Sequence, residues 1–236
     1  MKILVILPIL KHEVYEEITY RELEQVASKD TEIHVASLEK GPASIESAYD
    51  EALAVPGILE LVAKAEKKGF DAVIIDCMGD PGLEPAREIV DIPVVGSCQA
   101  SLAIASTLGQ KFSVVTALKS MTPLFHDLVR KYGYSTNFAS VRSIEVPVLD
   151  LEKRWNEMKE ALAREGRAAI EQDGADVIVL GCTGMIGMAK ELQETLKVPV
   201  VDPAPAALKL AELLVTLKLS QSKLVYPKPP EKVRVT

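Results

Sequence analysis

The chain has 236 residues, 48% of them hydrophobic and 26% charged, a composition typical of a globular protein with a substantial core. A net charge of −7 and an aromatic content of 5% argue against nucleic acid as the main partner. The amino-terminal apolar run lacks a small-residue cleavage site, and no run reaches the ~18 apolar residues of a transmembrane helix. Three cysteines do not make a disulfide framework. We therefore expect a cytoplasmic protein with no membrane partner.

Short apolar runs alternate with segments of helical periodicity along the whole chain. The expected strands are Ile3–Leu7, Ile33–Leu38, Ala72–Ile75, Val94–Val95, Phe112–Thr116, Ser140–Val146, Val177–Leu180 and Val200–Val201. The expected helices include Val14–Ala27, Ile58–Lys67, Met121–Lys131, Trp155–Ile170 and Ala206–Leu217. Fully apolar strands between helices predict an α/β fold whose parallel sheets are covered on both faces.

An internal repeat divides the chain into two similar halves. GFDAVIIDCMGDPG (69–82) aligns without gaps on GADVIVLGCTGMIG (174–187), an offset of 105 residues. Shorter matches keep nearly the same register, with DIPVVGS (91–97) against KVPVVDP (197–203) and KILVILPI (2–9) against KFSVVTAL (111–118). The repeat predicts two α/β lobes related by a pseudo-two-fold axis.

We expect the first lobe to comprise residues 1–97 together with 205–236, whose helix returns from the second half. Residues 98–204 form the second lobe, and the hinge between the lobes is expected near Gly96–Leu108. The tail YPKPPEKVRVT is proline-rich and is expected to run extended over the surface. The active site is expected in the cleft between the lobes.

Cys77 and Cys182 occupy matching positions of the repeat, one residue beyond a strand, and each opens a Cys-x-Gly turn. Ligands of open α/β sheets bind beyond the carboxyl ends of the strands. A helix starting at each turn would lower the pKa of the thiol through its backbone N–H groups and dipole. The alternative is that each cysteine is a small buried hydrophobic residue kept for packing. Neither cysteine has a second cysteine or a histidine at ligand spacing, so no metal site is expected.

Two thiols facing each other across a cleft suit one reaction class well. Inversion at a carbon acid needs a base on one face of the carbon and an acid on the other. A thiolate and a thiol can exchange these roles for the two enantiomers, while backbone N–H groups of the turns hold the enolate.

The two Cys-x-Gly turns in repeated α/β halves resemble the aspartate/glutamate racemase superfamily. DCMGDPGL, PVVGSCQAS, VVTALKSMTPLFHDLVRKYG and GCTGM are similar to its hydantoin/allantoin racemase branch. The resemblance implies a cofactor-independent racemase, acting on 5-substituted hydantoins or a related ring such as allantoin, that forms a homo-oligomer. It also implies that Cys77 and Cys182 are the two acid/base residues. The positions it implies for substrate binding are Pro8, Met78, Gly79, Thr116, Ala117, Thr183 and Gly184.

The chain departs from this branch after the first strand, where Leu7-Pro8-Ile9-Leu10 replaces the usual Asn-Pro-Asn-Thr. It also lacks the Cys-Asn-Thr and Cys-Thr-His or Cys-Thr-Glu turns common among amino-acid racemases. We expect no charged residue to assist either thiol, which favours a substrate whose carbon acid is already activated. An aspartate or glutamate racemase remains an alternative, as does a non-catalytic two-lobed protein that binds a small molecule.

Other polar residues have simpler interpretations. Cys98 is expected to be a packing residue at a helix start, and His126 a surface or packing residue. The Thr116 hydroxyl either binds a substrate oxygen or caps the next helix. Asp80 is expected to cap the helix that follows Cys77 and is assigned no catalytic role, and Asp76 is expected to be a strand-end residue. No Gly-x-Gly-x-x-Gly or phosphate loop follows the first strand, so nucleotide binding is not expected.

Overall fold

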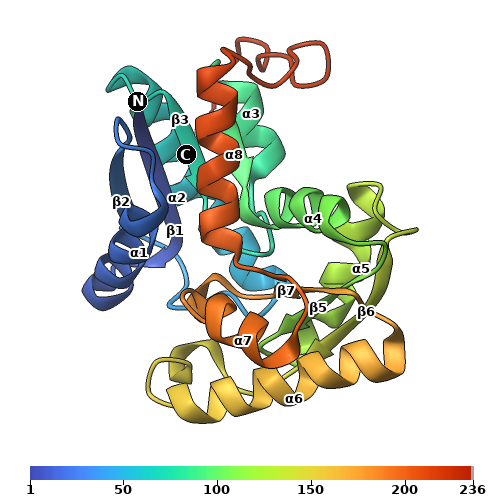
Figure 1. Ribbon diagram of the computed structural model, residues 1–236. Helices are drawn as coiled ribbons and strands as arrows, with labels where there is room; N and C mark the ends of the chain where they lie inside the picture. Colours follow the sequence, from blue (N-terminus) through green and yellow to red (C-terminus); the bar gives the residue numbers. More distant parts are fainter. Residues whose placement is uncertain (235–236) are drawn as a thin grey trace.

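The computed structural model describes residues 1–234 and contains two parallel sheets of four strands each (Figure 1). The first sheet has the order β2-β1-β3-β4, and the second has the matching order β6-β5-β7-β8. This matching topology follows the sequence repeat and confirms the α/β fold class. The strands are β1 (Lys2–Leu10), β2 (Glu32–Leu38), β3 (Ala72–Ile75), β4 (Val94–Gly96), β5 (Phe112–Thr116), β6 (Phe138–Ser143), β7 (Val177–Leu180) and β8 (Val200–Val201).

Helices cover both faces of each sheet. They are α1 (Glu13–Val26), α2 (Ala48–Lys67), α3 (Leu83–Ile89), α4 (Ser97–Leu108), α5 (Thr122–Lys131), α6 (Trp155–Asp173), α7 (Ala189–Leu196) and α8 (Pro203–Thr216). Three short 3₁₀ turns complete the structure: η1 (Lys119–Met121), η2 (Val148–Asp150) and η3 (Thr183–Met185). None of the helices among residues 1–234 is both long enough and apolar enough to cross a membrane.

Alternating side chains of β1 show why the sheets are covered on both sides. Leu4 and Ile6 pack with α2 and α3 on one face, whereas Ile3 and Val5 pack with α1 and α8 on the other. These side chains are at most 6% exposed, and burying one of this size contributes about 1.5–3 kcal/mol. A strand buried on both faces has to be apolar throughout, which is the pattern that the sequence shows.

Helices α4 and α8 connect the two sheets. Leu102 and Ala105 of α4 belong to the core of the second sheet, while Ala100 of the same helix packs with the first. Helix α8 follows the last strand of the second sheet and packs against α4, β3 and β4; Figure 1 shows it standing beside the first sheet. The segment Gly96–Leu108, where the hinge is expected, is occupied by α4, and its role as a hinge stays a prediction. The lobe boundaries themselves stay a prediction.

Helix α2 begins ten residues earlier than its periodicity predicts and contains Pro56 within its span. Ser47 caps its start by accepting a hydrogen bond from the Asp50 backbone N–H at 3.2 Å. At Gly57 a β-carbon would lie 3.2 Å from a side-chain carbon of Leu38, so this helix approaches the end of β2 closely. The tight packing of α2 on the sheet offsets the local cost of the proline, and helix propensity alone does not show this.

Strand β6 ends at Ser143, three residues before the predicted end. Glu145 adopts a left-handed backbone conformation with φ 56°, which no strand accommodates. Three further helices, α3, α4 and α7, were not among those named from periodicity. Helices α3 and α7 have only seven and eight residues, about two turns, and α4 is built mostly of small and apolar residues.

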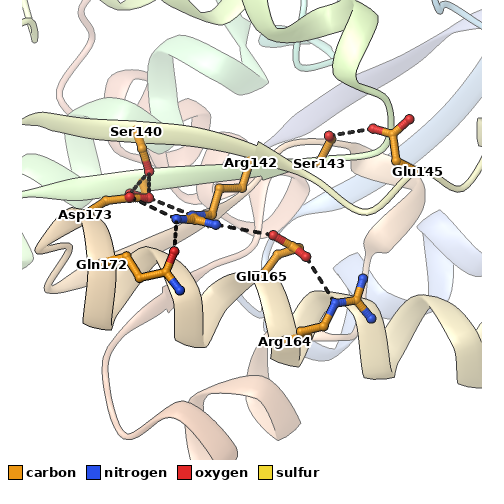
Figure 2. Close-up of polar contacts among 9 residues, drawn as sticks. Ser140, Arg142, Ser143, Glu145, Arg164, Glu165, Gln172 and Asp173 are labelled. Carbon is orange, nitrogen blue, oxygen red and sulfur yellow. Dashed lines mark hydrogen bonds and ion pairs between the residues drawn. The ribbon is translucent and has the colours of Figure 1, made fainter.

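A polar network covers the outer edge strand β6 (Figure 2). The Arg142 guanidinium donates to both carboxylate oxygens of Asp173, at 2.6 and 2.9 Å, and forms an ion pair with Glu165 at 3.5 Å. Ser140 donates a third hydrogen bond to Asp173, at 2.5 Å. These hydrogen bonds hold the pKa of the Asp173 carboxyl below its usual value, and the Arg142 contact is the largest cause. A charged edge of this kind ties β6 to α6 and discourages pairing with another chain.

Replacing Arg142 with alanine is expected to lower the free energy of unfolding by about 1–2 kcal/mol at pH 7, because it removes a paired, partly buried charge. The lowered pKa of Asp173 contributes stability above the pKa of the unfolded carboxyl, and that contribution disappears as pH falls through the folded pKa. Urea unfolding should therefore show the difference at pH 7 and its loss below about pH 3. The exposed pair Arg130–Asp127 provides the control, since R130A should change stability little. A deficit of R142A that persists at pH 2.5 would contradict the assignment.

The carboxyl-terminal segment after α8 contains no regular secondary structure and lies against the first sheet's helices. The Tyr226 hydroxyl accepts a hydrogen bond from Arg87 at 3.4 Å, and Lys228 pairs with Asp91 at 2.5 Å. The predicted surface position of the tail is confirmed up to residue 234, its extended conformation stays a prediction, and residues 235–236 lie outside the described residues.

Candidate active site

Cys77 and Cys182 both follow the carboxyl end of a central strand, β3 and β7 respectively. Each side chain is half-buried, and both line the same two adjoining cavities between the sheets. The residue after Cys182 ties the two turns together, because the Thr183 hydroxyl donates a hydrogen bond to the Asp76 carbonyl at 3.2 Å. The structure thus brings two residues 105 positions apart into one site.

The larger of the two cavities has a volume of about 770 Å³, part of it open to solvent, and largely apolar walls. Its apolar lining comes from the end of β1, from α1, and from the segment 148–155, where the Trp155 indole is 41% exposed. Leu7, Pro8, Ile9, Tyr15, Ile18, Ile45, Val148, Trp155 and Ile186 make up this lining. Asp76, Glu152 and Thr183 add polar groups. No Lys, Arg or His side chain lines either cavity within residues 1–234.

The seven residues implied to bind substrate all lie at the cavities. Pro8 and Gly184 line the larger one, and Thr183 lines both. Met78, Gly79, Thr116 and Ala117 line the smaller cavity, of about 420 Å³. Their roles in binding stay a prediction.

Gly79 lies in a crowded place beside the first thiol. Its backbone N–H donates to the Cys77 Sγ at 3.4 Å. A β-carbon at this position would lie 2.0 Å from the Glu51 Oε1, a buried carboxylate oxygen without a hydrogen-bond partner in the described chain. A larger residue in the Cys-x-Gly turn would therefore have to displace the Glu51 side chain from its place beside Cys77.

The prediction of lowered thiol pKa values is wrong for this structure. Burial raises the pKa of Cys182 to about 11, although the Gly184 backbone N–H opposes the shift. Burial also raises the pKa of Cys77, and the neighbouring carboxylate of Glu51 adds to it. No helix dipole compensates, because α3 begins only at Leu83 and Cys182 is followed by a single 3₁₀ turn. Burial therefore disfavours the thiolate form of both cysteines.

Asp80 caps a different helix from the one predicted. Its two carboxylate oxygens accept the backbone N–H groups of Cys98 and Gln99, each at 2.9 Å, at the start of α4. The Tyr132 hydroxyl donates a third hydrogen bond at 2.7 Å. The start of α3 instead has Gly82 in a left-handed conformation with no side-chain cap. Asp80 thereby fixes the Cys77 turn to the helix that connects the two sheets.

The remaining candidates have structural positions. Cys98 is fully buried at the second position of α4, as predicted for a packing residue. His126 is exposed and packs edge-on against Phe138, as predicted for a surface residue. The Thr116 hydroxyl caps no helix, because it donates to the Gly181 carbonyl at 3.2 Å.

Several acidic and phenolic groups at the site were missed by the sequence reasoning. Asp76 is 3% exposed and lines the larger cavity together with both cysteines. Glu46 and Glu51 approach the thiols from the loop before α2 and from its first turn, and Tyr15 from α1. Charged residues therefore do lie near both thiols, but these carboxylates raise the thiol pKa values and oppose ionisation. Only the position of Asp76, directly before Cys77, carried a signal, and it was interpreted as a strand end.

The described residues contain no group of three or more His, Cys, Asp and Glu side chains suited to hold a metal ion. Of the acidic groups near the thiols, Glu46, Asp76 and Asp80 accept hydrogen bonds from the protein. The Glu46 carboxylate, for example, accepts from the Val148 backbone N–H at 2.7 Å.

The chain has two α/β halves of the same topology, and one thiol from each half lies at a shared cavity. These features define a class of two-lobed protein with a paired-cysteine site. Residues 3–211 match the family model described as Asp/Glu/Hydantoin racemase, and the chain belongs to this family. It is an isomerase of that family.

Curated relatives and solved structures agree with this assignment. The chain is 45% identical to a hydantoin racemase of Pseudomonas sp. (strain NS671), over 87% of this chain and 83% of the relative. It is 38% identical to a hydantoin racemase of Paenarthrobacter aurescens, over 98% and 99% of the two chains. The structure of an allantoin racemase from Pseudomonas fluorescens superposes with a TM-score of 0.95 at 37% identity and covers all of both chains. Arylmalonate decarboxylase, at 17% identity and a TM-score of 0.63, shares the fold.

Proposed function

We propose that the protein racemises a neutral cyclic carbon acid, a 5-substituted hydantoin, with Cys77 and Cys182 as the two acid/base groups. The observation that carries this proposal is that one thiol from each half lines a shared, largely apolar cavity, to which none of residues 1–234 contributes a cationic side chain. The similarity to hydantoin racemases supports it.

In the proposed reaction one cysteine is a thiolate and the other a thiol. The thiolate removes the proton from C5 on one face of the ring, and the electron pair delocalises into the neighbouring carbonyl. The other thiol then donates its proton to C5 from the opposite face and becomes the thiolate. Each turnover therefore conserves protons and charge and leaves the pair ready for the opposite enantiomer.

The electrostatics of the site oppose a second negative charge on the pair. Each buried thiolate opposes ionisation of the other, and the carboxylates of Glu51, Asp76 and Glu46 oppose it further. The backbone N–H groups of Gly79 and Gly184 favour the thiolates. At least one proton therefore stays on the pair, and the two-base reaction uses the form in which one thiol has ionised.

The cavity walls favour an apolar substituent on the ring. Leu7 and Ile9 stand where the hydantoin branch usually carries asparagines, and both line the larger cavity with Trp155. Allantoin carries a ureido group at the same carbon, and burying its N–H and carbonyl groups against apolar walls would leave them without partners. An allantoin racemase remains an alternative, because structures bearing that name are 35–37% identical.

The aspartate/glutamate alternative has less support. A dicarboxylate substrate would enter a site with no lysine, arginine or histidine in the described lining, and it would face Asp76 and Glu152. Desolvating two carboxylates beside like charges is unfavourable. A cytoplasmic location and a homo-oligomeric assembly stay predictions from the sequence.

A substrate comparison tests the proposal. We expect loss of optical rotation with L-5-benzylhydantoin and L-5-isobutylhydantoin, with kcat/KM at least tenfold above that for allantoin, because each buried unpaired polar group costs about 1–3 kcal/mol. Solvent deuterium should enter C5 during turnover, after the uncatalysed rate is subtracted. L-Aspartate and L-glutamate serve as controls and should not racemise. Faster turnover of allantoin would select the alternative substrate, and no turnover of any compound would favour a non-catalytic binding protein.

A further inference from the structure

Asp76 is a buried carboxyl beside the reacting thiols that the proposed reaction does not use. It is 3% exposed, and its Oδ1 accepts a hydrogen bond from the Ser97 hydroxyl at 3.0 Å. Ser97 is the first residue of α4, the helix shared by both halves of the molecule. Within residues 1–234 no protein group donates to Asp76 Oδ2. The carboxyl is therefore fixed by one oxygen at the wall of the larger cavity.

The backbone of Asp76 also contacts the second half of the site. Its carbonyl accepts the Thr183 hydroxyl, and Thr183 directly follows Cys182. Asp76 thus belongs by sequence to the first cysteine turn and by contact to the second.

The second half cannot hold an equivalent carboxyl. Gly181 occupies the matching position of the repeat, and a β-carbon there would lie 2.7 Å from the Thr116 Cα, a backbone atom. The two thiols therefore have unequal surroundings although the halves share one topology.

The charged groups around the two thiols differ accordingly. Cys182 faces Asp76 and Glu46, with the Tyr15 phenol also near. Cys77 faces Glu51 and Asp80. Glu152 lines the larger cavity, and Asp202, at the start of α8, lies near Asp76 itself. Burial raises the pKa of Asp76 to about 7, and the Ser97 hydrogen bond opposes the shift.

We propose that Asp76 is a positioning residue that acts through Cys182: its ionised carboxylate, at the wall of the shared cavity, disfavours the Cys182 thiolate, so that different charges act on the two thiols. The catalytic meaning of this inference rests on the proposed two-base racemisation. The charge effect itself, which is confined to one thiol, can be measured from the reactivity of each cysteine without any substrate.

The test is the rate of alkylation of each cysteine by iodoacetamide, an uncharged probe, followed by peptide mass spectrometry. Asp76→Asn keeps the size of the side chain and an acceptor for Ser97 but removes the charge. A fall of about one unit in the pKa of Cys182 raises the thiolate fraction at pH 8 about tenfold. The less basic thiolate is about threefold less nucleophilic. We therefore expect alkylation of Cys182 to be roughly threefold faster in D76N. Cys77 in the same sample should be unchanged.

Glu51→Gln is the matched control, because Glu51 approaches the Cys77 turn. It should accelerate alkylation of Cys77 and leave Cys182 unchanged.

Ser97→Ala is the second variant if D76N folds poorly. Without the hydroxyl, Asp76 binds its proton more readily, so Cys182 should react faster at pH 7, by less than in D76N. Thermal unfolding of each variant establishes that it is folded.

Equal acceleration of both cysteines in D76N, or of neither, would overturn the inference, since either result means that the Asp76 charge does not act on Cys182 alone. Racemisation is measured separately. A protein that shows the selective alkylation pattern but racemises no hydantoin would contradict the proposed function and leave the charge effect established. A protein that racemises hydantoins but shows no selective alkylation would support the proposed function and contradict the inference about Asp76.

Discussion

Replacing Cys77 or Cys182 with serine is expected to lower the racemisation rate about a thousandfold, the size of effect typical of removing an acid/base group. A serine hydroxyl is far less acidic than a thiol, so it neither donates nor accepts the proton efficiently. Because the two thiols lie on opposite sides of the ring in the proposed reaction, each variant loses inversion but keeps one thiol. That thiol can still remove and return a proton on a single face. We therefore expect slow deuterium exchange of one enantiomer without inversion in C77S, and of the other in C182S.

Optical rotation and proton NMR, followed for each enantiomer, measure the two processes. Cys98→Ala is the control, because Cys98 is buried in α4 and lines neither cavity. It should keep activity within about threefold, at a stability cost of about 1 kcal/mol. Near-normal racemisation by either C77S or C182S would rule out the two-base mechanism.

Replacing Gly181 with alanine is expected to destabilise the protein by about 2–3 kcal/mol, the upper part of the range for overpacking a core. The added methyl group would lie 2.7 Å from both the Cα and the Cβ of Thr116 and 2.9 Å from a methyl of Val114. Both residues belong to β5, which pairs with β7, so the clash cannot be relieved by a side-chain rotation. The carboxyl end of β7 would have to move, and Cys182 with it.

Urea unfolding measures the stability change, and the racemisation assay measures the displacement of Cys182. Gly166→Ala is the matched control, because its new methyl group would meet only the end of the flexible Leu196 side chain. Its helical position also gains from the higher helix propensity of alanine, so a change within about 1 kcal/mol is expected. A stable and active G181A would contradict the packing argument and, with it, the reason why the second turn lacks a carboxyl.

Sequence alone determined the strands, the repeat and the paired cysteines, and the reason is local. A strand buried on both faces must be apolar, so β3, β5, β7 and β8 could be placed residue by residue. The positions of Cys77 and Cys182 after equivalent strands followed from the repeat, because the carboxyl ends of parallel strands share one edge of a sheet.

Tertiary structure decided the chemistry around those thiols. Asp80 caps α4, not the helix next to it in the sequence, because the chain folds back to place Cys98 and Gln99 beside it. The pKa values of the thiols rise because burial outweighs the backbone N–H groups, and burial depends on residues far apart in the chain. The inequality of the two halves comes from one position, where the first sheet has room for Asp76 and the packing of Thr116 leaves room only for Gly181.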